Sequence, residues 1–247
     1  MAGTVGIGDD GRMLPSPLGW PSLCAVCGTF GPGRVCRACL ARFAPARPRC
    51  ARCALPLDGA AEGAVCGACL AHPPPFDAAV AGVDYRAPWD RLLADFKFHD
   101  APELAGPLAA VLLDALRRRS DLAPGLVLPV PLARARLAER GHNQAWELAR
   151  RIARALEVPA EPSAVVRVRE TPHQLALPPD ARAGNVRGAF AVDPSRAERL
   201  AGRRVLLVDD VMTTGSTAGE VARALRAAGA AWVAVAVVAR VPRPGDR

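Results

Sequence analysis

One stretch of this chain, from residue 205 to residue 217, limits its fold and chemistry more than any other. Residues 205–208 read Val-Leu-Leu-Val, an unbroken apolar run typical of a strand buried on both faces of a parallel sheet. Asp209 and Asp210 follow at the predicted carboxyl end of that strand. A loop rich in hydroxyl residues comes next, and Thr217 and Glu220 fit the capping-box pattern S/T-x-x-E, which predicts that a helix begins there.

The loop has the chemistry of an anion site. Its backbone N–H groups would converge at a helix N-terminus, where unpaired amides and the helix dipole favour a phosphate. Gly215 permits a positive φ angle and a close approach of the backbone. Further donors come from the hydroxyls of Thr213, Thr214, Ser216 and Thr217. Asp209 and Asp210 would repel a phosphate, but they suit a sugar, because carboxylates accept hydrogen bonds from hydroxyls or hold a divalent cation.

This stretch resembles the phosphoribosyl pyrophosphate (PRPP) signature of type I phosphoribosyltransferases. The resemblance implies that Asp209 and Asp210 bind the ribose hydroxyls, that residues 213–217 hold the 5′-phosphate, and that Mg²⁺ accompanies PRPP. An ordinary capped helix without a ligand would leave two adjacent carboxylates and four hydroxyls unexplained. A phosphoacceptor receiver domain can also contain Val-Leu-Leu-Val-Asp-Asp, but it needs a Lys downstream, and no Lys follows Asp210.

The eight cysteines form four CxxC pairs between residues 24 and 69. Two thiolates of a CxxC pair can reach one metal ion, so the spacing predicts two structural Zn²⁺ sites with four thiolates each. Sequential pairing gives Cys24, Cys27, Cys36 and Cys39 for one site and Cys50, Cys53, Cys66 and Cys69 for the other. Cross-braced pairing is the open alternative. Disulfides conflict with a cytoplasmic protein, and iron–sulfur clusters usually have other spacings.

Length and charge set broad limits on function. The chain has 247 residues, enough for one medium domain and a small module, and its net charge of +8 suits a phosphorylated substrate or a nucleic acid. Aromatic residues make up only 4 %, which argues against a platform for stacked bases. We see neither a signal peptide nor an apolar stretch of transmembrane length, so we expect a soluble cytoplasmic protein without membrane insertion.

Strand and helix patterns alternate after residue 75. Strands are expected at 80–85, 126–132, 164–168, 205–208 and 232–239, and helices at 88–98, 104–116, from 143 onward and at 217–228. This order implies a right-handed, mostly parallel α/β sheet, in which ligands bind beyond the carboxyl ends of the strands.

Other basic residues suggest a pyrophosphate site. Arg134 and Arg140 follow a buried strand in what we expect to be a loop, and guanidinium groups suit pyrophosphate. A basic surface loop is the alternative interpretation. Lys97 is the only lysine among 32 basic residues, which hints that a point charge is needed there. The long polar connection that contains Arg169, Thr171 and Gln174 is typical of a lid.

These motifs together resemble the competence protein F (ComF) family. The matching segments are the cysteine pairs, Lys97-Phe98, residues 130–136, Arg140-Gly141-x-Asn143-Gln144, Arg169-x-Thr171-x-x-Gln174 and Asn185-Val186-x-Gly188-Ala189-Phe190. The resemblance covers nearly residues 20–240. It implies a double zinc ribbon at 20–72 and a type I phosphoribosyltransferase-like domain at 76–241, between a disordered N-terminus at 1–19 and a flexible tail at 242–247. His142 departs from the family, which commonly has Phe there. The family is linked to DNA uptake but also occurs outside transformable bacteria.

Two functions follow from this resemblance. As an enzyme, the chain would bind PRPP with Mg²⁺ and transfer phosphoribosyl to an unknown acceptor with release of pyrophosphate. Lys97, Arg134 and Arg140 would neutralise the leaving group, and the segment from Arg169 to Gln174 would close over it. As a non-catalytic accessory of DNA uptake, the chain would bind a nucleotide, and its zinc ribbons would bind single-stranded DNA or an uptake protein. A homodimer stays open in both cases.

Overall fold

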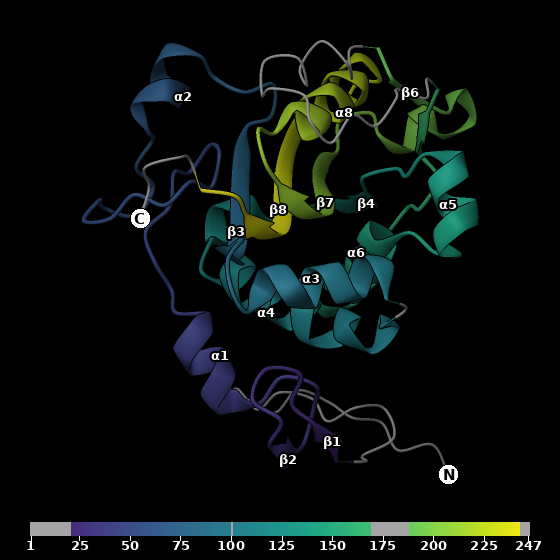
Figure 1. The fold of residues 1–247 in the computed structure, drawn as a ribbon. Helices are drawn as coiled ribbons and strands as arrows, with labels where there is room; N and C mark the ends of the chain where they lie inside the picture. Colours follow the sequence, from purple (N-terminus) through teal and green to yellow (C-terminus); the bar gives the residue numbers. More distant parts are fainter. Residues whose placement is uncertain (1–20, 100, 169–187, 243–247) are drawn as a thin grey trace.

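The structure is a computed structural model, and it describes residues 21–99, 101–168 and 188–242. Its centre is a four-stranded parallel sheet with the strand order β3-β8-β7-β4 (Figure 1). The strands are β3 (Ala78–Asp84), β4 (Leu126–Pro129), β7 (Arg204–Met212) and β8 (Trp232–Arg240). The predicted α/β fold with a parallel sheet flanked by helices is therefore confirmed.

Helices cover both faces of the sheet (Figure 1). On one face, α3, α4 and α6 pack against Leu206 and Val208 of β7. On the other face, α8 packs against Leu207 and Val235, together with a small antiparallel pair, β5 and β6. The bounds are α3 (Trp89–Phe98), α4 (Ala105–Arg117), α6 (Gln144–Ala155), α8 (Ser216–Ala227), β5 (Val165–Arg167) and β6 (Phe190–Val192). Three short 3-10 helices, η1 (Pro102–Leu104), η2 (Ser120–Leu122) and η3 (Pro194–Arg199), complete this part.

Apolar spacing explains how these elements pack. Strand β8 is buried over its whole length except at Trp232, as expected for a central strand covered on both faces. Helix α3 buries Trp89, Leu92, Leu93 and Phe96, the spacing of one helical face. Each such side chain contributes about 1.5–3 kcal/mol through its burial. Gly82 lets α4 lie directly on β3, because a Cβ there would meet Val111 Cγ1 at 2.7 Å.

The cysteine-rich segment places its two halves on different faces of the sheet. The first half holds β1 (Ser22–Leu23), β2 (Phe30–Gly31) and α1 (Arg37–Phe43), and it packs against the core below α3 and α4. Trp89 Nε1 donates to the Phe43 carbonyl at 2.6 Å in this contact. The second half ends in α2 (Gly67–Ala71) and lies beside β3, where Ala79 N donates to Ala51 O at 3.0 Å. The chain thus wraps from one face of the sheet to the other before β3 begins (Figure 1).

Three predicted elements differ from the structure. The strand predicted at 205–208 continues to Met212, so Asp209 and Asp210 lie inside β7 and not after it. The strand predicted at 164–168 pairs antiparallel with β6 and does not join the parallel sheet. The loop predicted after β4 contains a helix, α5 (Arg134–Arg140). Among the described residues, no helix has the length and apolar character needed to cross a membrane.

Candidate phosphosugar site and cysteine clusters

The segment of residues 213–217, here called the phosphate loop, links the end of β7 to the start of α8. Gly215 takes a positive φ of 83° at the N-cap, and Thr214 Oγ1 lies 2.7 Å from Ser216 Oγ. The amides of Thr213, Thr214, Gly215 and Thr217 have no hydrogen-bond acceptor among the described residues. Unpaired amides therefore lie at the start of a 12-residue helix, where the sequence predicts an anion site.

The predicted capping box is wrong. Helix α8 begins at Ser216, one residue before the expected start, because Gly215 in the left-handed conformation turns the chain into the helix. Glu220 therefore lies too far along the helix to reach back to its start. Its carboxylate instead accepts a hydrogen bond from Gly188 N at 3.2 Å and pairs with Arg223. Glu220 thereby joins α8 to the residues that precede β6.

Asp209 and Asp210 lie beside the phosphate loop, and the ammonium group of Lys97 lies close to them. Asp210 is buried, and its Oδ2 lies 2.9 Å from Lys97 Nζ on α3. Asp210 N donates to Asp209 Oδ1 at 2.9 Å. Burial, and then the charge of Asp210, raise the pKa of Asp209 to about 8, although Lys97 opposes this. Burial disfavours the charge of Lys97, but Asp210 outweighs burial and raises the pKa of Lys97 above its usual value. The only lysine of the chain is therefore an internal partner of a predicted ribose-binding acid.

Arg140 lies at the end of α5, which Gly141 terminates with a φ of 71°. Its guanidinium lies 4.7 Å above the ring centroid of Phe98 and donates to Gln144 Oε1 at 3.3 Å. Burial and the neighbouring Arg136 lower the pKa of Arg140, while the charge of Asp210 counteracts them. The Phe98 ring and the buried Gln144 amide thus hold Arg140, the predicted pyrophosphate ligand. Neither residue was predicted from the sequence to belong to the site.

Asn143 fixes the start of α6 against the end of β4. Its Oδ1 accepts from Ala145 N at 2.9 Å, and its Nδ2 donates to Val130 O at 3.2 Å. An Asn before a helical pattern is a known start signal, so this position was readable from the sequence. The side chain of Arg134 is not described, and the predicted lid residues Arg169, Thr171 and Gln174 lie outside the described residues, as do residues 1–19 and most of the tail.

The cysteines form two groups that follow the sequential pairing. The first cysteine cluster is Cys24, Cys27, Cys36 and Cys39, the second cysteine cluster is Cys50, Cys53, Cys66 and Cys69, and within each the sulfur atoms lie within 4.8 Å of one another. The sulfurs of the second and third cysteines are 3.7 Å apart in the first cluster and 3.8 Å apart in the second. A tetrahedral site with Zn–S bonds of about 2.3 Å requires nearly this separation.

Backbone amides prepare both clusters for a metal. Cys36 N donates to Cys24 Sγ and Cys66 N to Cys50 Sγ, each at 3.3 Å. Although burial opposes it, these amide hydrogen bonds lower the pKa of Cys24 and bring the pKa of Cys50 to about 7, which favours the thiolate at the first cysteine of each cluster. Burial instead raises the pKa of Cys39 and Cys69, and raises the pKa of Cys53 to about 11. Four sulfur donors and no oxygen or nitrogen donor in each group suit a closed, structural site.

Comparisons with known proteins agree with this geometry. A family model described as phosphoribosyl transferase domain matches residues 142–247, and one described as double zinc ribbon domain matches residues 18–70. The DNA utilization protein YhgH of Escherichia coli K12 is 34% identical over 222 residues, which is 87% of this chain and 95% of that protein. Competence protein F of Haemophilus influenzae is 36% identical over 197 residues, 78% of this chain and 85% of the relative. The chain belongs to the ComF family.

A solved structure, the glutamine PRPP amidotransferase from B. subtilis, aligns with this ComF-family chain at a TM-score of 0.38 and 20% identity, covering 57% of this chain and 30% of the other.

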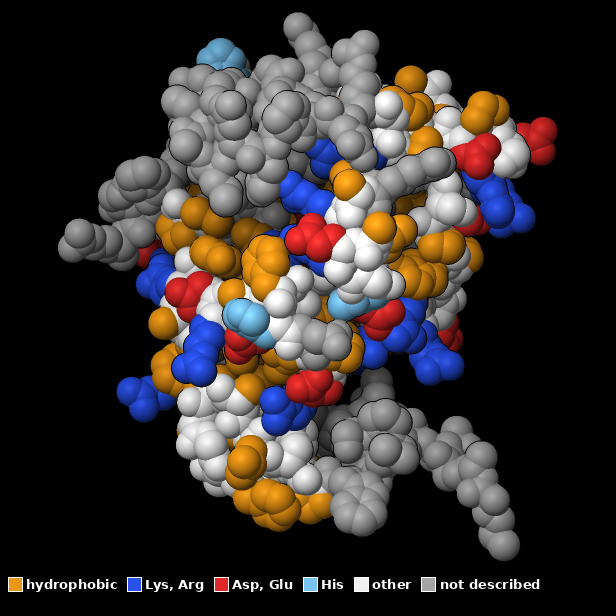
Figure 2. All heavy atoms as spheres, turned by 45° about the vertical axis from the view of Figure 1, so that its right-hand side comes forward, with side chains coloured by type: hydrophobic (Ala, Val, Ile, Leu, Met, Phe, Trp, Pro, Cys, Tyr) orange, Lys and Arg blue, Asp and Glu red, His pale blue; other side chains and the backbone are white. Residues whose placement is uncertain are grey.

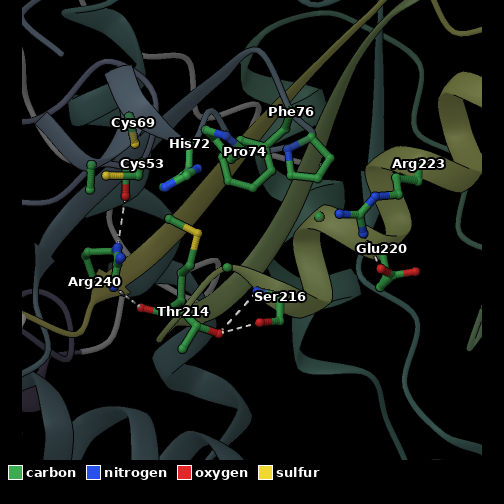
Figure 3. A pocket seen from close by; sticks show the side chains of 15 residues that line it. Cys53, Cys69, His72, Pro74, Phe76, Thr214, Ser216, Glu220, Arg223 and Arg240 are labelled. Atoms are coloured by element: carbon green, nitrogen blue, oxygen red, sulfur yellow. Dashed lines mark hydrogen bonds and ion pairs between the residues drawn. The ribbon is translucent and has the colours of Figure 1, made fainter. Parts of the chain in front are cut away.

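A cavity of about 590 Å³ borders the phosphate loop of this ComF-family protein (Figure 3). It opens between the loop, the second cysteine cluster and the proline-rich segment that joins them. Its lining includes Cys53, Cys69, His72, Pro74, Phe76, Met212, Thr214, Ser216 and Arg240. Thr214 and Gly215 of the phosphate loop line it, whereas Asp209 and Asp210 do not, so the cavity reaches the loop but not the two acids.

Proposed function

We propose that this protein binds PRPP together with Mg²⁺ at the carboxyl edge of β7 and transfers the phosphoribosyl group to an acceptor. The observation that carries this proposal is the set of unpaired amides of the phosphate loop beside Asp209 and Asp210. The amides and hydroxyls of residues 213–217 would take the 5′-phosphate. The two carboxylates would take the ribose hydroxyls. A phosphosugar carries an anionic phosphate and neutral ribose hydroxyls, so it matches amide donors at one end of the site and carboxylate acceptors at the other.

The reaction would exchange the bond at C1 of the ribose. The C1–O bond to pyrophosphate breaks, the leaving oxygen keeps the electron pair, and a nucleophile of the acceptor forms the new bond to C1. Mg²⁺ would neutralise the pyrophosphate, and carboxylate oxygens such as those of Asp209 and Asp210 are ligands that it prefers. Lys97 and Arg140, with Arg134, would stabilise the developing charge, and Arg169, Thr171 and Gln174 would close over it.

Lys97 would change partners when the substrate binds. In the structure its ammonium pairs with Asp210 at 2.9 Å. A pyrophosphate group and Mg²⁺ beside Asp210 would compete for both members of the pair. Such an exchange keeps the half-buried lysine charged and paired before and after binding.

We further propose that both cysteine clusters hold structural Zn²⁺ and that the protein works in the cytoplasm, where thiols stay reduced. The double zinc ribbon would occupy residues 20–72, and the transferase-like domain residues 76–241. The names of its relatives, DNA utilization protein and competence protein F, support a role in the uptake or use of DNA.

A second candidate function is a non-catalytic accessory that binds single-stranded DNA through the zinc ribbons. The net charge of +8 favours it. Against it, basic and acidic side chains are mixed on the face shown in Figure 2, and no single basic patch gathers there. A steep decrease of DNA affinity with salt, lost when residues 1–75 are deleted, would support this second candidate.

Calorimetry with PRPP and Mg²⁺ tests the main proposal. We expect the wild type to bind, and Asp209→Asn and Asp210→Asn to lose most of the affinity. Asp114→Asn is a matched control, because its exposed side chain pairs only with Arg118 along α4. Release of pyrophosphate across a panel of nucleobases and amines then tests transfer. If the wild type binds no PRPP, or if the two variants bind as it does, the proposal is wrong.

A further inference from the structure

Arg240 connects two parts of the chain that are far apart in sequence. It ends β8 and is 5% exposed. Its Nε donates to the carbonyl of Cys53, a member of the second cysteine cluster, at 2.9 Å. Its Nη1 donates to the carbonyl of Met212 at 3.1 Å and to that of Thr213, the first residue of the phosphate loop. One buried guanidinium therefore bridges the second cysteine cluster and the phosphate loop (Figure 3).

The fork shape of the guanidinium makes this bridge rigid. Nε and Nη1 point in fixed directions in one plane, so a shift of the Cys53 carbonyl must move Arg240 or break its bond. The same Nη1 also lies 2.7 Å from Val241 O, so its two N–H groups are shared among three carbonyls. The position of Thr213 is thus tied to the position of Cys53.

The cavity makes the phosphate loop dependent on these ties. The cavity of about 590 Å³ lies against the loop, beside the buried side chains of Phe76 and Met212. Apart from Arg240, the loop is supported there by the proline-rich segment after the second cysteine cluster. A Cβ on Gly215 would lie 3.5 Å from Phe76 Cζ, and a Cβ on Gly219 would lie 3.2 Å from Pro75 Cδ. Phe76 and Pro75 follow the second cysteine cluster in the chain, whereas Met212 of β7, whose Sδ would also lie 3.5 Å from a Cβ on Gly215, supports the loop from the sheet.

Among the described residues, the first cysteine cluster makes no hydrogen bond to the phosphate loop or to Arg240. It packs against the opposite face of the sheet, where Phe43 and Trp89 make the contact. The two clusters therefore have the same donor set but different neighbours. A comparison of the two can distinguish the effect of losing a metal from the effect of losing the metal that lies next to the phosphate loop.

We propose that Arg240 is a positioning residue that couples the metal-loaded state of the second cysteine cluster to the shape of the phosphate loop. With a metal bound, the Cys53 carbonyl is fixed, Arg240 is fixed on it, and the loop amides converge on the 5′-phosphate. Without the metal, the carbonyl moves, Arg240 loses its anchor, and the loop loses its arrangement. This inference rests on the proposed function only for the identity of the ligand.

Arg240→Lys tests the coupling, because lysine keeps the charge and loses the fork. We expect the variant to keep both zinc ions by elemental analysis and to bind PRPP about tenfold more weakly. NMR order parameters of the loop amides should fall from about 0.85 toward 0.6, while those of α4 stay unchanged. Arg150→Lys is the control, because Arg150 lies exposed on α6 and pairs only with Glu147 among the described residues.

The matched pair Cys69→Ser and Cys39→Ser tests the metal arm. Both are the last cysteine of their cluster, buried in a short helix, at 7% and 6% exposure. Each should lose one zinc, but only Cys69→Ser should lower the loop order parameters and the PRPP affinity. Equal effects of the two variants, or an Arg240→Lys protein with wild-type order parameters, would overturn the coupling. The order parameters need no ligand, so the coupling is tested even if the wild type binds no PRPP.

Discussion

The two cysteine clusters have the same chemistry and different surroundings. In each, an amide donates to the first sulfur at 3.3 Å, and the third cysteine is the N-cap of a short helix. The first cluster is near the surface, with Cys27 exposed, and it borders the helical face of the sheet. The second has Cys50 fully buried and borders β3 and the phosphate loop. The ligand spacing decides the metal geometry, whereas the packing of the surrounding residues decides what depends on the metal.

Among our predictions, the loss of one metal should show the largest difference in stability between the two clusters. Structural zinc contributes on the order of 10 kcal/mol to the folding of small metal domains. We expect Cys69→Ser to lower the melting temperature of the whole chain more than Cys39→Ser, because the second cluster also covers the edge of β3. Calorimetric melting with zinc analysis measures both. A larger loss for Cys39→Ser would reverse the comparison.

Asp84 ties the segment between the clusters to the sheet. Its carboxylate lies 2.8 Å from Arg49 Nη1, 2.5 Å from Arg47 Nη1 and 2.6 Å from Arg86 Nη2, and Asp84 is 7% exposed. Asp84→Asn would leave the arginines without their carboxylate, so we expect a loss of about 3 kcal/mol in the free energy of unfolding. Denaturant unfolding measures this loss, and Asp114→Asn, an exposed pair, should change it by less than about 0.5 kcal/mol.

The same carboxylate predicts a loss of stability in acid. Burial alone would raise the pKa of Asp84, but Arg49, followed by Arg47 and Arg86, lowers it below the usual value of 3.8. Its contribution is therefore complete above pH 3.8 and is lost as the pH falls through the lower folded-state pKa. The difference between wild type and Asp84→Asn should shrink as the pH falls below about 4. A difference that stays constant down to pH 2 would contradict the ion-pair explanation.

Asp209, which lies beside the phosphate loop, should change the stability of the protein with pH in the direction opposite to Asp84. Its pKa is raised to about 8, so the folded state loses stability as the pH rises from 3.8 through 8. Asp209→Asn removes that loss. We expect the variant to be more stable than wild type at pH 9 by about 1 kcal/mol, a discounted figure because water screens a half-buried carboxylate. At pH 3 the two should be equally stable, and melting curves at both pH values measure this.

The sequence predicted what is encoded locally. The apolar run at 205–208, the hydroxyl-rich loop and the CxxC spacing each fix their own geometry, and the structure has them nearly as expected. It could not predict contacts between distant segments. Nothing near Lys97 in the sequence points to Asp210, and nothing near Arg240 points to Cys53. The capping box failed because Gly215 adopts a positive φ and starts the helix one residue earlier, and the sequence does not show which of the two start signals is used.

Arg140 and the phosphate loop differ in what holds them in position, because an aromatic side chain and not a cysteine cluster holds Arg140. Its guanidinium lies 4.7 Å above Phe98, which is 66% exposed, and such a contact at an exposed site is worth about 0.5–1 kcal/mol. Phe98→Ala should therefore weaken PRPP binding only about two- to fivefold and leave both zinc ions in place. Leu137→Ala is the control, because Leu137 is 43% exposed on the same helix as Arg140. Phe98→Ala could instead weaken binding as much as Arg240→Lys. A surface aromatic contact would then matter as much for binding as the buried link to the second cysteine cluster, and the proposed difference between Arg140 and the phosphate loop would be wrong.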